Sequence, residues 1–141
     1  MTDITEFLYH RAPMIFLDEI IESGPNFLVA GVHIRPGIPY FEETRGVPAW
    51  VGLEYMAQAV AAFAGIRART DNRPIVLGML IGCRQYSSKI PSFAPGTRIE
   101  VRIQELASVD NGLGSFDCTL TASDCIAEGR IAVYGGARKP H

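Results

Sequence analysis

The sequence predicts an α+β fold in which an antiparallel β-sheet wraps around one long central helix. Three observations support this prediction. Residues 47–66 form a helix-length apolar run, two β-like runs precede it, and three or four follow it. The run is apolar around most of its circumference, as a helix enclosed by a curved sheet must be. A helix of about 18 residues is roughly 27 Å long, comparable with strands of about eight residues.

Length and composition indicate a single domain, residues 1–141. A chain of 141 residues can bury a core without disulfides or metals. The 13 Lys and Arg residues against 15 Asp and Glu residues leave a net charge of −2, which argues against a general nucleic-acid binder. The three cysteines, Cys83, Cys118 and Cys125, fit neither a CxxC pair nor a zinc pattern, so we expect reduced thiols and no metal site.

The N-terminal sequence and the length of the apolar run predict a cytoplasmic protein without a membrane span. The opening Met-Thr-Asp-Ile-Thr-Glu-Phe-Leu carries acids and lacks the basic start and apolar centre of a signal peptide. The apolar stretch at 55–66 is too short to cross a bilayer. We therefore expect neither a signal peptide nor a membrane span.

The residues before the apolar run predict a short helix and a β-hairpin. Residues 4–9 are expected to form the helix. Residues 14–22, rich in Ile, Leu and Phe, and residues 27–35 predict two strands. The Ser-Gly-Pro-Asn sequence between these strands is a turn signal, so they should pair. Residues 36–46 are expected to be irregular, and loops of this kind, held against a rigid element, often carry sites.

The residues after the helix predict a series of antiparallel strands. A break at residues 70–74 ends the helix. The Asn-Gly pair at 111–112 is a strong hairpin signal, because both residues tolerate the positive φ angles of a tight turn. The polar tail, 135–141, is expected to be loose. The expected strands are residues 75–88, 97–109, 112–122 and 126–134, separated by turn-forming residues 91–96, 110–112 and 123–125.

Glu54 is the one ionisable carboxylate in the apolar run and the main functional lead. If the helix starts near Pro48, a residue suited to the first helical position, Glu54 lies about two turns in. Burial there would raise its pKa by about 3–5 units, as expected of a proton-transfer residue. The structural alternative is a carboxylate that reaches water or pairs with an arginine. Gln58, one turn later on the same face, either lines a polar channel with Glu54 or satisfies it by hydrogen bonding.

Two stretches of the sequence resemble a known family. His-Arg-Ala-Pro-Met-Ile-Phe-Leu-Asp at residues 10–18 and Val-Pro-Ala-Trp-Val-Gly-Leu-Glu-Tyr-Met-Ala-Gln at residues 47–58 resemble the two signature stretches of the hot-dog β-hydroxyacyl-ACP dehydratases of FabZ/FabA type. The second stretch is especially similar to the ApeP-like branch, which is associated with aryl polyene pigment clusters. The motifs have the family's order and separation, and the resemblance spans essentially the whole chain. It implies the hot-dog fold, the architecture predicted above.

The resemblance implies dehydration of a 3-hydroxyacyl thioester on acyl carrier protein to the trans-2-enoyl thioester, in fatty acid or polyene-type lipid biosynthesis. This elimination moves only protons, so no cofactor is expected. Glu54 aligns with the family's catalytic acid. The backbone N–H groups of Ala49 and Trp50 are candidate donors to the thioester oxygen. The other candidate substrate-binding residues are Tyr40, Phe41, Gly46, Val47 and Gln58.

The family's second catalytic group, a histidine in a Gly-His-Phe-Pro segment before the helix, has no counterpart at residues 39–48. A general base contributes about 10²–10⁴ in rate, so its absence is serious. His33 at the end of a strand, Glu42 and Glu43 in the loop, and His10 are candidate replacements. The structural alternatives are an exposed strand residue for His33, solvated loop charges for the two glutamates, and a turn-fixing residue for His10.

The missing histidine leaves other interpretations open. The resemblance implies dimers that join their sheets and form sites from both chains, so we expect a homodimer or a heterodimer with another hot-dog subunit. In a catalytically incomplete subunit, Glu54 would serve a partner's histidine or line an acyl tunnel with Trp50, Met56 and Phe63. A thioester-binding or thioester-hydrolysing protein, in which a carboxylate activates water, is the third interpretation. The Met-Ala-Gln sequence after Glu54 disfavours it.

Basic residues after the helix are candidates for docking acyl carrier protein, which presents an acidic surface. The alternative explanation is a solvated helix end, where cations lie near the free C-terminal carbonyls. The residues concerned are Arg67, Arg69, Arg73, Arg84 and Lys89.

Overall fold

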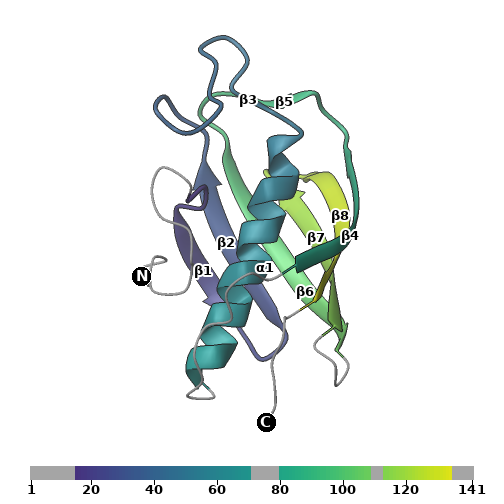
Figure 1. Ribbon diagram of the computed structural model, residues 1–141. Coiled ribbons are helices and arrows are strands. Elements are labelled where there is room, and N and C mark those ends of the chain that lie inside the picture. Colours follow the sequence, from purple (N-terminus) through teal and green to yellow (C-terminus); the bar gives the residue numbers. More distant parts are fainter. Residues whose placement is uncertain (1–14, 71–79, 109–112, 135–141) are drawn as a thin grey trace.

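A computed structural model of the chain describes residues 15–70, 80–108 and 113–134, which form a curved six-stranded antiparallel sheet with one helix against its concave face (Figure 1). The strand order is β1-β2-β6-β7-β8-β4, and β3 pairs with β5 in a separate two-stranded sheet. The predicted fold class is confirmed. The elements are β1 Glu19–Ser23, β2 Phe27–His33, β3 Val47–Pro48, α1 Val51–Thr70, β4 Leu80–Ser88, β5 Ser92–Phe93, β6 Arg98–Ser108, β7 Leu113–Thr121 and β8 Cys125–Tyr134.

The hairpin predicted before the helix is confirmed, with a shorter first strand. β1 and β2 pair antiparallel. β1 begins at Glu19 rather than at residue 14, because the segment before it turns toward the helix, where the Phe16 N–H donates to the Gln58 side chain (2.8 Å). The short helix predicted at residues 4–9 lies outside the described residues.

The strands predicted after the helix are present as β4, β6, β7 and β8, each antiparallel to its neighbours. The helix ends at Thr70, where the sequence predicts a break. β5 lies within the segment 91–96, for which the sequence predicts only a turn. The hairpin turn expected at 111–112 and the tail at 135–141 lie outside the described residues.

The pairing of β3 with β5 moves the start of the helix to a later residue than the sequence predicts. Pro48 lies in β3 and not at the first helical position. The Ala49 N–H donates to Pro91 O (2.9 Å), which holds the chain away from the helical path for one more residue. Helix α1 therefore begins at Val51, and Glu54 lies in its first turn instead of two turns in.

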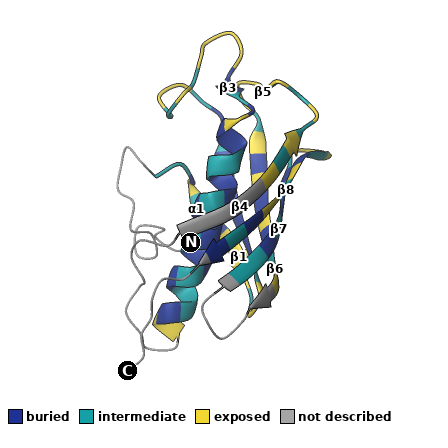
Figure 2. Ribbon diagram, turned by 45° about the vertical axis from the view of Figure 1, so that its right-hand side comes forward, coloured by how far each residue is buried: buried dark blue, intermediate teal, exposed yellow. Residues whose placement is uncertain are grey.

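The core lies between α1 and the concave face of the sheet (Figure 2). In β2 and β6, alternate side chains pack against the helix and the others face outward, as the period of a strand requires. The inward side chains of these two strands include Leu28, Ala30 and Val32 from β2 and Ile99, Val101 and Ile103 from β6.

Over residues 51–65 the helix is buried along most of its circumference, as predicted, apart from a row of partly buried side chains that we call the helix stripe. The stripe is apolar except for its first turn, where Glu54 lies. No helix in the described part of the chain is long and apolar enough to cross a membrane. The helix stripe consists of Leu53, Glu54, Ala57, Ala61 and Ala64.

Arg67 connects the C-terminal end of α1 to the sheet through hydrogen bonds. Its guanidinium makes two hydrogen bonds to the Glu105 carboxylate (2.6 and 3.0 Å) and one to Pro25 O (2.9 Å). Its Cζ also lies 4.6 Å from the centre of the Phe63 ring. A two-pronged arginine–carboxylate pair of this kind fixes geometry as well as charge. Arg67 therefore has a structural role in this fold.

Candidate active site at the start of the central helix

Glu54 lies partly exposed in the first turn of α1, beside the side chain of Gln58 one turn later. Nε2 of Gln58 is 3.4 Å from Oε2 of Glu54. Residues four apart lie on the same face of a helix, so this contact follows from the spacing in the sequence. This separation is long for a hydrogen bond, so the contact is weak, although it orients the carboxylate.

Gln58 is held in one orientation. It is 1% exposed, and its Oε1 accepts a hydrogen bond from the Phe16 N–H at 2.8 Å. A backbone N–H can only donate, so the amide oxygen must face Phe16 and the amide nitrogen must face Glu54. Of the two roles that the sequence leaves open for Gln58, hydrogen bonding with Glu54 is therefore the one that the geometry favours.

Two backbone donors are free at the start of the helix. Within residues 15–70, 80–108 and 113–134, the N–H groups of Trp50 and Val51 meet no acceptor. The first N–H groups of a helix lack intrahelical partners, so such donors are expected there. The Ala49 N–H, also predicted as a donor, is already bonded to Pro91 O. The donor pair is thus Trp50 and Val51 instead of Ala49 and Trp50.

A row of aromatic rings runs from the surface above the helix start into the core. Trp50 and Tyr40 are 60% and 55% exposed, and their ring centres lie 4.9 Å apart. Tyr40 contacts Phe16 edge-on, Phe16 contacts Tyr55 in the same way, and Tyr55 stacks on Phe93, with centre distances of 6.1, 6.3 and 6.3 Å. Edge-on and offset stacked pairs are favourable arrangements for aromatic rings.

The loop before the helix is tightly built. Tyr40 has a positive φ of 66°, which is uncommon for a bulky residue. Glu42 and Gly46 exchange two backbone hydrogen bonds (2.7 and 2.8 Å), which close the loop between them. Gly46 has a φ of 86°, and a Cβ atom there would collide with the Phe93 carbonyl oxygen. Phe41 is partly buried against the core.

The predicted substrate-binding residues of this loop thus fall into two groups. Tyr40 and Trp50 are exposed at the rim of the site. Val47 is fully buried in the core and Gly46 lies beneath the backbone of β5, so neither presents a side chain to the rim.

Tyr55 also lies in this region. The sequence pattern predicts it as a core residue but does not predict a role for its hydroxyl. Its hydroxyl is buried and makes no hydrogen bond to any residue in the described part of the chain. Burial raises the pKa of Tyr55 well above its ordinary value, and the nearby Asp18 and Tyr86 side chains raise it further. The hydroxyl therefore stays protonated and is a free donor. A tyrosine in an apolar helix carries no sequence signal for this property.

Tyr86 of β4 supports the start of the helix from the other side. Its hydroxyl donates to Ala49 O at 2.6 Å. Burial raises the pKa of Tyr86 to about 12, so it too remains a donor. A Cβ atom at Gly52 would collide with this hydroxyl, so only glycine allows the first helical turn to lie so close to β4.

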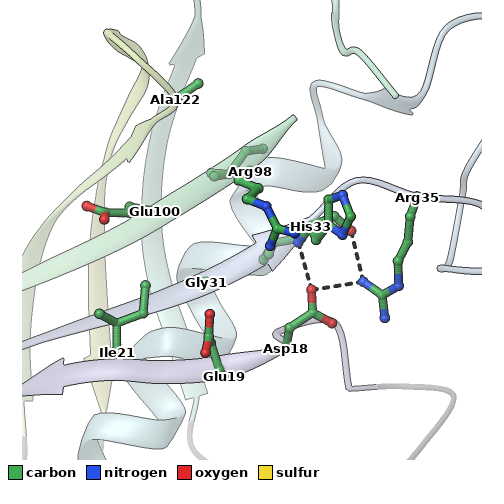
Figure 3. A pocket seen from close by; sticks show the side chains of 11 residues that line it. Asp18, Glu19, Ile21, Gly31, His33, Arg35, Arg98, Glu100 and Ala122 are labelled. Atoms are coloured by element: carbon green, nitrogen blue, oxygen red, sulfur yellow. Dashed lines mark hydrogen bonds and ion pairs between the residues drawn. The ribbon is translucent and has the colours of Figure 1, made fainter. Parts of the chain in front are cut away.

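The candidate bases that the structure describes, His33, Glu42 and Glu43, make no hydrogen bond or ion pair with Glu54. His33 follows the inward-facing Val32 and points to the outer face of the sheet, where it lines a hollow with Asp18 and Arg98 (Figure 3). Glu42 forms an exposed ion pair with Arg45 (3.3 Å).

Glu43 is exposed in the same loop as Glu42. His10 and His141 lie outside the described residues. The described residues therefore place no imidazole beside Glu54.

The sequence profile of the ApeP-like family, described as ApeP dehydratase, matches residues 2–140. The chain belongs to the ApeP-like dehydratase family. No curated protein matches its sequence.

Solved structures share the hot-dog fold of this ApeP-like chain. It is similar to a chain of the dehydratase heterocomplex ApeI:P from Xenorhabdus doucetiae, with a TM-score of 0.88 and 19% identity over 98% of this chain and 93% of that one. The PaaI protein of the E. coli phenylacetic acid degradation operon matches with a TM-score of 0.63 and 14% identity, over 82% and 81% of the two chains. A hypothetical thioesterase with coenzyme A from Streptococcus pneumoniae matches with a TM-score of 0.65 and 6% identity, over 86% of this chain and 88% of that one.

In this ApeP-like chain, the start of α1 brings together groups suited to acid catalysis on a carbonyl compound. Glu54 can carry one transferable proton, and Gln58 orients it. The N–H groups of Trp50 and Val51, which meet no acceptor among the described residues, can donate hydrogen bonds to an oxygen on which negative charge develops. Among the described residues, no three His, Cys, Asp or Glu side chains gather as a metal site would require.

Proposed function

We propose that this chain is a subunit of a 3-hydroxyacyl thioester dehydratase, with Glu54 as the proton donor to the leaving hydroxyl. The observation that carries the proposal is the position of Glu54. In a chain of the ApeP-like dehydratase family, it is the carboxyl in the first turn of the central helix, oriented by Gln58 and beside two free backbone donors.

The proposed reaction is a proton-coupled elimination. A base removes a proton from C2 of the acyl chain, and negative charge develops on the thioester oxygen. The N–H groups of Trp50 and Val51 are the proposed donors to that oxygen. The C3–O bond then breaks as the Glu54 carboxylic acid protonates the hydroxyl, which leaves as water. The products are the trans-2-enoyl thioester, a protonated base and the Glu54 carboxylate, and return of the proton from base to carboxylate restores the site.

The base is proposed to come from a second hot-dog subunit. Three observations support this. The described residues place no imidazole beside Glu54, and the apolar helix stripe next to it is only partly covered. The similar ApeI:P structure is itself a dehydratase heterocomplex. A subunit seated on the stripe would both bury Leu53, Ala57 and Ala61 and bring its own histidine to Glu54.

The acyl group is proposed to arrive on acyl carrier protein, in the cytoplasm, for fatty acid or aryl-polyene-type synthesis. The proposed docking residues are Arg69 and Lys89, both of which are exposed at the surface. The side chains of Arg73 and Arg84 lie outside the described set. Lys89→Glu and Arg69→Glu should weaken binding of the carrier protein, whereas Arg130→Glu, on the outer face of β8, should not. Equal binding by all variants would exclude this docking surface.

The test is turnover of a 3-hydroxyacyl carrier protein, followed by mass spectrometry as loss of water. The chain is assayed alone and after co-expression with a hot-dog subunit that carries the family's loop histidine. We expect turnover by the pair only, and its loss in Glu54→Gln. Turnover by the chain alone that disappears in His33→Ala or Glu43→Gln would place the base in this chain. Release of free acid instead of enoyl thioester would indicate a thioesterase.

A further inference from the structure

A polar hollow lies on the outer face of the sheet, over β1, β2 and β6 (Figure 3). Its volume is about 640 Å³, within the range of small-molecule pockets. The sheet separates it from the helix and from Glu54, which is not part of its lining. Gly31 is part of the lining, and the side chains of Glu19 and Ile21 lie over it, 3.1–3.2 Å from the position that a Cβ atom would take.

One end of the hollow is basic. His33 of β2 and Arg98 of β6 are direct cross-strand partners, so their side chains rise next to each other. Arg35 lies beside them and donates to His33 O (3.0 Å). The acid at this end is Asp18, and its Oδ2 already accepts from the His33 N–H (2.7 Å) and from Arg35 (3.0 Å). Arg98 has no hydrogen-bond or ion-pair partner within the described ranges.

The other end is acidic. Glu19 pairs with Gly31 in the β1–β2 register, and Gly31 pairs with Glu100 in the β2–β6 register. Glu19 and Glu100 therefore lie on the two strands that flank Gly31, with the Glu19 side chain folded over it. Neither has a hydrogen-bond or ion-pair partner among the residues that the structure describes.

The basic and acidic rows stand two residues apart along the strands, which corresponds to about 7 Å. In the basic row, His33 and Arg98 lie directly opposite one another on neighbouring strands, whereas Glu19 and Glu100 of the acidic row lie on β1 and β6, with β2 between them. Across the hollow, the two rows offer complementary charges to a molecule that carries both signs at this separation.

We propose that this hollow binds a small dipolar molecule, an amine that also carries a phosphate or a carboxylate group. Its oxyanion lies between Arg98, His33 and Arg35, and its ammonium group lies between Glu19 and Glu100. Guanidinium groups bind such oxyanions through paired hydrogen bonds. The inference does not rest on the proposed dehydratase function.

The test is calorimetric titration of the full-length chain with O-phosphoethanolamine, with β-alanine, and with inorganic phosphate as a probe that lacks the amine. We expect one of the two dipolar probes to bind. The probe that binds with the higher affinity shows whether the site prefers a phosphate or a carboxylate group. Arg98→Gln should weaken that binding about tenfold or more. Glu100→Gln should weaken binding of the dipolar probe but not of phosphate. Arg130→Gln, an arginine on the same outer face but paired with Asp117, is the matched control and should leave binding unchanged.

Three results would overturn the proposal. The first is absence of binding by both dipolar probes at millimolar concentration. The second is binding that Arg98→Gln leaves unchanged. The third is equal binding of phosphate and the dipolar probe with no effect of Glu100→Gln, which would mean a plain anion site. Circular dichroism of each variant verifies that the fold is intact.

Discussion

The amide of Gln58 presents Nε2 to the carboxylate of Glu54 across one helical turn, at 3.4 Å from Oε2. Because the Phe16 N–H fixes the amide oxygen, the amide cannot turn over. Oε2 of Glu54 is therefore an acceptor toward Gln58. Oε1, which makes no hydrogen bond to any residue in the described part of the chain, is the oxygen that can carry a proton toward a substrate.

The first prediction concerns the stability that Gln58 provides. Gln58→Met keeps the side-chain volume but leaves the Phe16 N–H without its acceptor. We expect the free energy of unfolding in urea to fall by about 1–3 kcal/mol, the usual cost of an unpaired buried donor. The exposed Gln85→Met should change it by less than about 0.5 kcal/mol. Equal stability of the two variants would show that the Gln58–Phe16 contact contributes little.

The second prediction separates backbone strain from steric collision in the loop before the helix. Gly46 and Gly37 both have positive φ angles, 86° and 97°. A Cβ at Gly46 would collide with the Phe93 carbonyl, whereas a Cβ at Gly37 meets no atom within 4 Å. Gly37→Ala should therefore lose about 1–2 kcal/mol from conformation alone, and Gly46→Ala should lose a further 1–3 kcal/mol or so. Thermal unfolding of both variants would show which one loses more stability. A larger loss of stability in Gly37→Ala than in Gly46→Ala would contradict the prediction.

The third prediction compares the hydroxyls of two tyrosines near the start of the helix. The hydroxyl of Tyr55 has no partner in the described part of the chain, whereas that of Tyr86 donates to Ala49 O. Tyr55→Phe should leave the free energy of unfolding unchanged or raise it, because it removes an unpaired polar group. Tyr86→Phe should lower it by about 1 kcal/mol, because Ala49 O loses one of its two hydrogen bonds and keeps only that from the Gly52 N–H. Denaturant titration distinguishes the two, and a larger loss in Tyr55→Phe would mean that its hydroxyl has a partner in solution.

The fourth prediction is a pH dependence of stability. Burial raises the pKa of the Cys118 thiol from 9.0 to about 12, and the nearby Asp117 carboxylate adds to the shift. The folded state thus holds this proton more tightly than the unfolded state. The stabilisation is complete below pH 9 and is lost as pH rises from 9 toward 12, because the unfolded chain ionises first.

Cys118→Ala tests this dependence with the wild-type chain as its control. At neutral pH the variant should be less stable by a constant amount, because it loses buried volume. Between pH 9 and 12, the stability difference between wild type and variant should shrink, since the variant has no thiol to ionise. A difference in the free energy of unfolding between wild type and Cys118→Ala that stays constant from pH 9 to 12 would contradict the raised pKa of Cys118.

Much of the fold follows from the sequence because its signals are local. The apolar run predicts α1, and alternating patterns with turn residues predict β2, β6, β7 and β8. β5 has only two residues and depends on pairing with β3, so no local pattern marks it. The same pairing moved the helix start from Pro48 to Val51, which a local preference for proline at a first helical position could not reveal.

The candidate site was predictable in part, for a similar reason. Glu54 and Gln58 stand out because they are polar residues on an apolar helix, four positions apart. The contact that fixes Gln58 comes from Phe16, 42 residues away, and no sequence spacing encodes it. His33 was a candidate base because of its position at a strand end, but strand alternation turns it to the outer face. The unpaired Tyr55 hydroxyl depends on packing alone.

The most direct test of the role of Glu54 is the rate of water loss from a 3-hydroxyacyl carrier protein by the co-expressed pair of subunits, with Glu54 intact or changed to glutamine. Gln at this position can still accept from Gln58 but has no acidic proton to give. We predict a rate reduced by about 10² or more, with binding of the carrier protein unchanged. A Glu54→Gln pair that dehydrates at the wild-type rate would contradict the central role assigned to Glu54.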